Sequence, residues 1–244
     1  MAAAIGYMIF IGFGDWGGIG TQTLSVPGLP TYQGVHAVEL VATVVVGVLA
    51  AAVIAAVRRA AQRVDTTALQ RLGLPVLLLA GGLAVGVIAE VADLLGADSQ
   101  DVLFSGQASI PALLAESSTK LVLVLLVAKA AAYAICLGCG FRGGPVFPAI
   151  FLGVALATLL MDVTDMSPTA ALAVGSAAGM AAMTRMLLTS ALLAALLVGS
   201  AGIDAAPIAV LASVTAWLAI AVLDPEPPPK APVDAIEEPD PAVR

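Results

Sequence analysis

Eight apolar segments, separated by short polar or glycine-containing breaks, limit most strongly how this chain can fold. Hydrophobic residues make up 60% of its 244 residues, and Asp, Glu, Lys and Arg together make up only 11%, against about 25% charged residues in an average soluble domain. Too little polar sequence remains to cover so much apolar surface in water. The composition excludes a soluble enzyme, a nucleic-acid-binding protein and a disordered chain. It predicts an all-α, polytopic protein of the cell membrane.

The apolar segments differ in length relative to the roughly 20 residues that a helix needs to cross a bilayer. They are Ala2–Phe13, Val38–Val57, Leu74–Leu95, Leu121–Leu137, Val146–Met161, Thr169–Met183, Met186–Val198 and Ala206–Leu223. Several are too short to span alone. Short helices broken by Gly and Pro at membrane depth must be buried in protein or line a watery cavity, because their free N–H and C=O groups cannot face lipid. The pattern predicts broken and re-entrant helices, as in transporters and channels.

The remaining sequence divides the chain and orients it. Residues 1–223 are predicted to form one membrane domain, and Asp224–Arg244, rich in Pro and acidic residues, is predicted to be a disordered tail. Four arginines, Arg58, Arg59, Arg63 and Arg71, are expected in one short loop, which the positive-inside rule places in the cytoplasm. The loop Gly96–Ser118, without Lys or Arg, is then expected outside.

A glycine-rich link between two apolar segments is the most informative stretch. Gly138, Gly140, Gly143 and Gly144 lie within seven residues, and glycine permits sharp turns and close backbone approach. Pro145 suits the first turn of a helix.

The helix that follows this link begins with N–H groups that have no partner within the helix. Val146, Phe147 and Ala149 can offer theirs, whereas Pro145 and Pro148 cannot. These donors and the positive end of the helix dipole suit an anion. The alternative is a tight helix–helix turn that binds no ligand.

The residues around this link resemble a known family. Gly144-Pro145-Val146-Phe147-Pro148, followed by Ala-Ile-Phe-Leu-Gly, is similar to the G-x-F-x-P helix start of CLC chloride channels and proton-coupled chloride transporters. The similarity continues, in the family's order and spacing, in Ser105-Gly106 with Ile110-Pro111, in Leu121–Lys129 and in Leu172–Thr189. It covers roughly Gly14–Leu223 and resembles only the C-terminal half of a CLC membrane domain.

The resemblance implies a function, a site and partners. It implies transport of chloride or a similar anion by a channel or a proton-coupled exchanger. The anion is expected to bind at the turn formed by Gly144, Pro145, Val146 and Phe147. It also implies a homodimer, or a partner N-terminal half, in the lipid bilayer. Neither a cofactor nor a metal is expected.

Three departures from the family keep an alternative open. The motif's Phe position holds Val146, and Pro145 removes one amide that the family can use. The family's G-S-G-I-P and G-K/R-E-G-P turns, the second with its gating glutamate, have no counterpart, and neither has its pore-facing tyrosine: Tyr7, Tyr32 and Tyr133 lie elsewhere. The alternative is a non-conducting truncated protein, or a half-subunit that needs a separate N-terminal half.

Two further polar features remain. Lys129 lies within an apolar segment, where it is expected to face protein or water; it either attracts anions or makes a buried contact with a carbonyl or carboxylate. Cys136 and Cys139 form a C-x-x-C pair. The chain has no second pair, and its single histidine, His36, is distant in the sequence. The two cysteines are therefore interpreted as small packing residues rather than as zinc ligands. No segment pairs a nucleophile with a base or groups metal ligands, which argues against a membrane-embedded enzyme.

Overall fold

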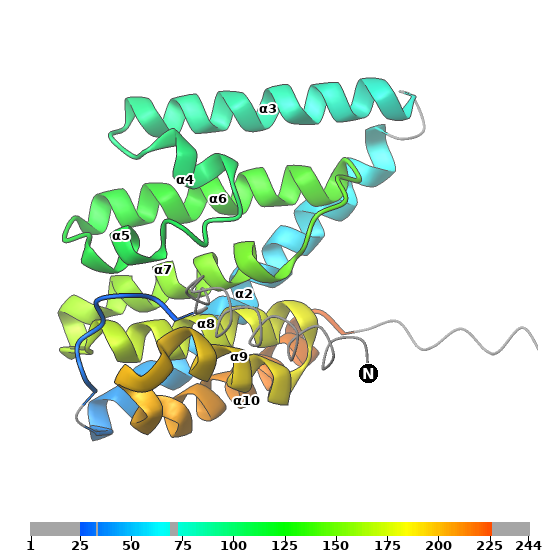
Figure 1. The fold of residues 1–244 in the computed structure, drawn as a ribbon. Coiled ribbons are helices and arrows are strands. Elements are labelled where there is room, and N and C mark those ends of the chain that lie inside the picture. The colour runs from blue at the N-terminus through cyan, green and yellow to red at the C-terminus, as the bar shows by residue number, and fades with distance from the viewer. Residues whose placement is uncertain (1–24, 33, 69–72, 226–244) are drawn as a thin grey trace, which may run out of the picture.

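The computed structural model describes residues 25–32, 34–68 and 73–225, and all regular elements among them are helices (Figure 1). In chain order they are α2 (Ala37–Ala68), α3 (Leu74–Leu94), α4 (Ser99–Leu103), α5 (Ile110–Ala115), α6 (Thr119–Gly138), α7 (Val146–Thr164), α8 (Pro168–Thr184), α9 (Leu187–Val198), the 3-10 helix η1 (Gly199–Ala205) and α10 (Ala206–Leu223). The predicted all-α class is confirmed. The predicted segment Ala2–Phe13 lies outside the described residues.

Helix lengths fall into two groups, as the sequence predicts. Among the described residues, α2, α3, α6 and α10 are long and apolar enough to cross a bilayer, whereas the apolar parts of α7 and α9 are shorter. The short helices therefore lie among longer ones, which supply the protein environment that broken helices need.

Two predicted loops contain helix. Arg58, Arg59 and Arg63 lie in the last turns of α2, because arginine is a good helix former and the helix continues beyond its apolar part. Arg71 lies outside the described residues. The predicted loop Gly96–Ser118 contains α4 and α5, which are too short to show as periodic segments.

The core of the molecule is α8, a helix surrounded by others. Every residue from Thr169 to Ala182 is buried, and α8 packs against α2, α7, α9 and α10. Its crossing with α7 brings backbone against backbone: a Cβ placed at Gly179 would lie 2.0 Å from the Ala149 carbonyl oxygen, and one at Gly153 would lie 2.0 Å from that of Gly175. Small residues permit this close packing of helices in membrane proteins, and it fixes where α7 begins.

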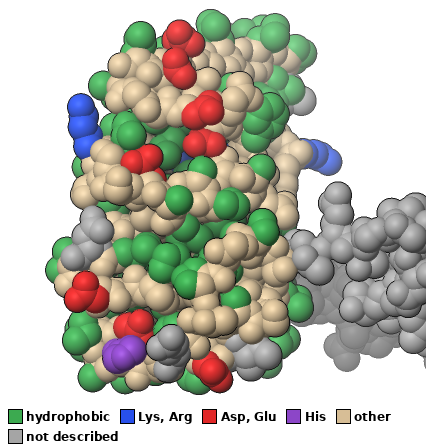
Figure 2. All heavy atoms as spheres, turned by 60° about the vertical axis from the view of Figure 1, so that its left-hand side comes forward, with side chains coloured by type: hydrophobic (Ala, Val, Ile, Leu, Met, Phe, Trp, Pro, Cys, Tyr) green, Lys and Arg blue, Asp and Glu red, His purple; other side chains and the backbone are tan. Residues whose placement is uncertain are grey.

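Hydrogen bonds and ion pairs join α2 to the end of α8. Arg58 of α2 donates to the Met183 carbonyl at 2.5 Å and pairs with Asp224 at 3.1 Å, and Arg185 pairs with Asp224 at 3.6 Å. Asp224, the first residue of the predicted tail, is thus held by α2 and the end of α8; the rest of that tail, from residue 226, lies outside the described residues. Acidic side chains gather on the face that Figure 2 brings forward.

Candidate functional site

The link between α6 and α7 is the glycine-rich stretch that the sequence singles out. Helix α6 ends in a Schellman motif: Gly140 has a φ of +78°, its N–H donates to the Leu137 carbonyl at 3.3 Å, and the Phe141 N–H donates to the Cys136 carbonyl at 3.0 Å. A residue with a side chain would be strained at this φ. The chain then runs without helix from Phe141 to Gly144.

Helix α7 begins at Val146, as predicted, with Pro145 at its N-cap position. The Tyr133 hydroxyl donates to the Pro145 carbonyl at 3.1 Å. Tyr133 lies five residues before the end of α6, or about 7.5 Å at the rise of an α-helix. The start of α7 is therefore set back from the end of α6, at a depth that this hydrogen bond fixes.

The first turn of α7 keeps free backbone donors. No side chain caps it, and in the part of the chain that the structure describes no hydrogen bond joins the N–H of Val146 or Phe147 to an acceptor. Both residues are half-buried, and Gly144 and Pro145 before them are exposed. Ala149, the third predicted donor, is fully buried. The accessible donors are therefore those of Val146 and Phe147.

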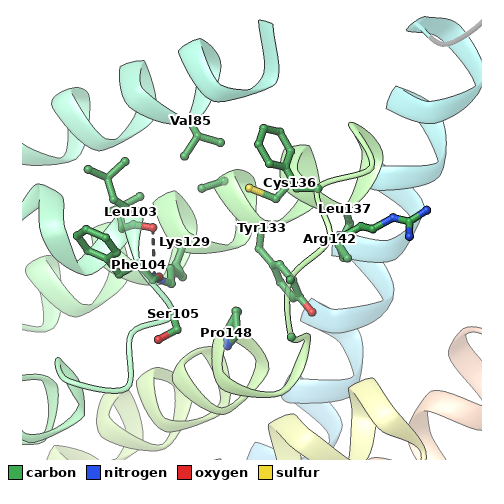
Figure 3. A pocket seen from close by; sticks show the side chains of 15 residues that line it. Val85, Leu103, Phe104, Ser105, Lys129, Tyr133, Cys136, Leu137, Arg142 and Pro148 are labelled. Carbon is green, nitrogen blue, oxygen red and sulfur yellow. Dashed lines mark hydrogen bonds between the residues drawn. The ribbon is translucent and has the colours of Figure 1, made fainter. Parts of the chain in front are cut away.

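Two hollows flank this helix start. The first, of about 330 Å³, lies between α3, α4, α6 and the link (Figure 3). Its lining includes Ser105, Lys129, Tyr133, Cys136, Arg142, Gly143, Gly144 and Pro148. The second, of about 300 Å³, lies toward α8 and α9 and is lined by Val146, Met180, Thr184, Met186 and Thr189, among others. The structure thus brings Gly144 and Val146, both predicted site residues, to the walls of two different hollows.

Lys129 makes the buried carbonyl contacts that one of its two sequence interpretations expects. Its ammonium donates to the carbonyls of Asp101 at 2.6 Å, Val102 at 3.2 Å and Phe104, around the end of α4. It also lies 5.1 Å from the centre of the Phe151 ring, a favourable cation–π distance. Only 2% of Lys129 is exposed, yet it lines the first hollow (Figure 3).

The two cysteines are free thiols in different surroundings. Cys139 is buried against Gly81 of α3, where an added Cβ would lie 2.7 Å from the sulfur, and burial raises the pKa of its thiol. Cys136 is half-buried and lines the first hollow. The packing interpretation suits Cys139, whereas Cys136 also faces the cavity.

Sequence reasoning did not assign a role to Tyr133. Its phenol stands in an apolar helix, and a buried tyrosine hydroxyl usually finds a partner. That signal is present in the sequence, but the partner, Pro145, is defined only once α7 folds back along α6.

Comparison with known proteins places this geometry in a family. The chain matches the voltage gated chloride channel family over residues 1–220. It is 34% identical over 133 residues to the YfeO proteins of Escherichia coli strain SMS-3-5 and Escherichia fergusonii, and 33% identical to that of Shigella boydii serotype 18. Each of these relatives is provisionally named an ion-transport protein. No solved structure matches the chain.

The family match and the matches to individual relatives cover different shares of the sequences. The aligned region covers 50% of this chain but only 30% of the relatives' own length. The family match, in contrast, covers almost the whole chain, and the helical, membrane-spanning architecture agrees with it. The chain therefore belongs to the voltage gated chloride channel family and is an integral, multi-pass membrane protein.

Proposed function

We propose that this chain supplies the C-terminal half of an anion-transporting unit, in which chloride or a similar anion binds at the start of α7. The observation that carries the proposal is the uncapped first turn of α7, at the half-buried residues Val146 and Phe147, behind an exposed link. The match to the voltage gated chloride channel family supports an anion as the class of substrate.

The physical basis of binding is a partial rather than a full charge. The free N–H groups and the helix dipole together present about half an elementary positive charge. An anion held in this way gives up part of its hydration without forming an ion pair, so it binds weakly enough to leave again. The space beside Gly143 and Gly144 is open, because among the described residues an added Cβ at either would meet no atom within 4 Å.

The partner of this half is part of the proposal. The family resemblance suggests a homodimer, or an N-terminal half, on this or another chain, that contributes the turns without a counterpart in these residues, including one with a gating glutamate. Whether the complete unit is a channel or a proton-coupled exchanger depends on that half. The alternative, a chain that does not conduct, is an outcome of the experiment below.

Anion flux tests the function directly. The chain is reconstituted into liposomes, alone and after co-expression with an N-terminal half from a relative, and chloride efflux is followed with an ion-selective electrode. We expect efflux from at least the co-expressed pair. Absence of efflux from both preparations would overturn the transport proposal and favour the non-conducting alternative.

A backbone substitution tests the site. Replacing the amide of Phe147 by an ester removes one N–H without changing the side chain. The matched control is the same replacement at Thr169. This residue is likewise the second of its helix, α8, but it is fully buried. We expect chloride binding, measured by calorimetry, to weaken about tenfold for the Phe147 ester only. Equal weakening in both proteins, or in neither, would contradict the assigned site.

A further inference from the structure

The first hollow contains a positive charge that the proposed site does not use. Lys129 is one of its lining residues, together with Gly143, Gly144 and Pro148 of the link and helix α7. Among the described residues, no carboxylate lies within ion-pair distance of the Lys129 ammonium. The Asp101 carboxylate is near enough to interact with it, whereas the side chain of Arg142, another lining residue, extends away from the hollow (Figure 3).

Structural capping alone does not require this charge. The three carbonyls around the end of α4 need hydrogen-bond donors, and a neutral amide could supply two of the three. Insertion of a lysine into the apolar interior of a membrane is costly. The fold thus holds a costly charge at a place where a neutral donor would satisfy most of the same carbonyls.

We propose that this hollow is the antechamber through which the anion reaches the link at Gly143 and Gly144, just before the start of α7, and that Lys129 is its fixed positive charge. The inference rests on the function proposed above and adds to it the residue that raises the local anion concentration. Lys129 does not ligate the ion, because its three ammonium hydrogens are taken up by the carbonyls of Asp101, Val102 and Phe104. It acts through its field, which leaves the anion mobile.

Cys136 provides a native probe of that field. It lines the same hollow and is half-buried, whereas Cys139 is buried and can be removed as Cys139→Ala. Cys136 lies two helical turns from Lys129 on one face of α6, about 10 Å along the axis. We would measure its rates of modification by anionic sulfonatoethyl methanethiosulfonate and by the cationic trimethylammonioethyl reagent. The ratio of the two rates cancels changes in thiol ionisation, which affect both reagents alike.

The variants separate the charge of Lys129 from its hydrogen bonds. Lys129→Gln keeps a donor but removes the charge, and we expect it to lower the anionic-to-cationic rate ratio about tenfold, given the separation and a partly hydrated cavity. Lys129→Arg keeps the charge and should leave the ratio within about twofold. An unchanged ratio in Lys129→Gln, an equal fall in Lys129→Arg, or no reaction of Cys136 with either reagent would overturn the proposal.

A structural control addresses the stability of α4. Asp98 caps α4 by accepting from the Gln100 N–H at 2.8 Å, so Asp98→Ala loosens this helix without adding negative charge to the hollow. We expect no fall of the rate ratio in Asp98→Ala. A fall comparable to that of Lys129→Gln would show that the ratio reports the integrity of α4, and would overturn the assignment to charge.

Occupancy by an anion tests the route. Thiocyanate, compared with gluconate at equal ionic strength, should slow the anionic reagent at Cys136 more than the cationic one. If thiocyanate slowed both reagents equally, the hollow would not lie on the anion's path. These results do not depend on the Phe147 ester experiment, so failure of the antechamber and failure of the α7 site can be told apart.

Discussion

The starts of α7 and α8 invite comparison, because both are proline-containing helix starts in the same bundle. Helix α8 is capped: the Ser167 hydroxyl accepts from the Ala170 N–H at 3.2 Å, and Thr169 beside it is fully buried. Helix α7 has no side-chain cap, and the link before it is exposed.

This difference shows that a side chain satisfies a backbone N–H group at the start of α8, whereas the N–H groups at the start of α7 have no side-chain partner. A buried helix start without a cap would leave N–H groups unsatisfied, at a cost of about 1–3 kcal/mol each. The chain satisfies one such group at α8. At α7 it fixes only the carbonyl of Pro145, through Tyr133, and leaves the neighbouring N–H groups free. The capped helix α8 positions the uncapped helix α7 through the close backbone contact between Gly179 and Ala149.

The largest effect should come from breaking that positioning. Gly179→Ala would place a Cβ 2.0 Å from the Ala149 carbonyl oxygen, and since the obstacle is backbone, α7 and α8 must separate. We expect a loss of about 3 kcal/mol or more in the free energy of unfolding, at the upper end of overpacking effects, measured by denaturant titration in detergent micelles.

The control for this substitution lies in α3. A Cβ at Gly82 meets no atom of the described residues within 4 Å, so Gly82→Ala should stabilise the protein slightly by lowering the backbone entropy of the unfolded chain. If Gly179→Ala were as stable as Gly82→Ala, the close crossing of α7 and α8 would not be what holds the site.

The next effect should come from capping the uncapped helix. Pro145→Asp places a carboxylate where the anion is expected to bind, and acidic N-caps stabilise helices. We expect chloride binding to weaken by at least about tenfold while the unfolding free energy is unchanged or rises. Calorimetric titration with chloride measures the first quantity and denaturant titration the second. Retained chloride affinity would argue that the anion binds elsewhere.

Sequence reasoning found the features that are local in the chain. The start of α7 at Val146 follows from Gly-Gly-Pro after an apolar helix, and the long segments follow from runs of apolar residues that no soluble helix needs. Lys129, in contrast, finds its three carbonyls 25 to 28 residues earlier in the chain, and Arg58 finds Asp224 166 residues later. No periodicity encodes these pairs, because they depend on how helices pack.

The same distinction explains the errors at helix ends. The arginines after Val57 look like a loop because they interrupt an apolar run, but a helix can continue out of the bilayer with charged residues that favour it. The hydroxyl of Tyr133 and the hollow beside it were beyond sequence analysis for the reason that applies to Lys129: both are formed by segments that meet only in the folded bundle.

A smaller effect should come from uncapping the capped helix. Ser167→Ala removes the acceptor for the Ala170 N–H, and loss of such a cap typically costs about 1 kcal/mol. We expect this decrease in the unfolding free energy with no change in chloride affinity. Should Ser167→Ala weaken chloride binding as strongly as Pro145→Asp, the two helix starts would not have the separate roles that their capping indicates.

The smallest effect should come from adding a donor to the uncapped helix. Pro145→Ala restores one N–H beside those of Val146 and Phe147 and keeps the carbonyl that accepts from Tyr133. One additional N–H donor should raise chloride affinity about threefold, within the net contribution of about 0.5–1.5 kcal/mol for a hydrogen bond, as measured by calorimetry. The matched control is Pro168→Ala, which adds an N–H at the start of α8. Equal gains in both variants would mean that any helix start in this bundle binds the anion, and the contrast between α7 and α8 would lose its functional meaning.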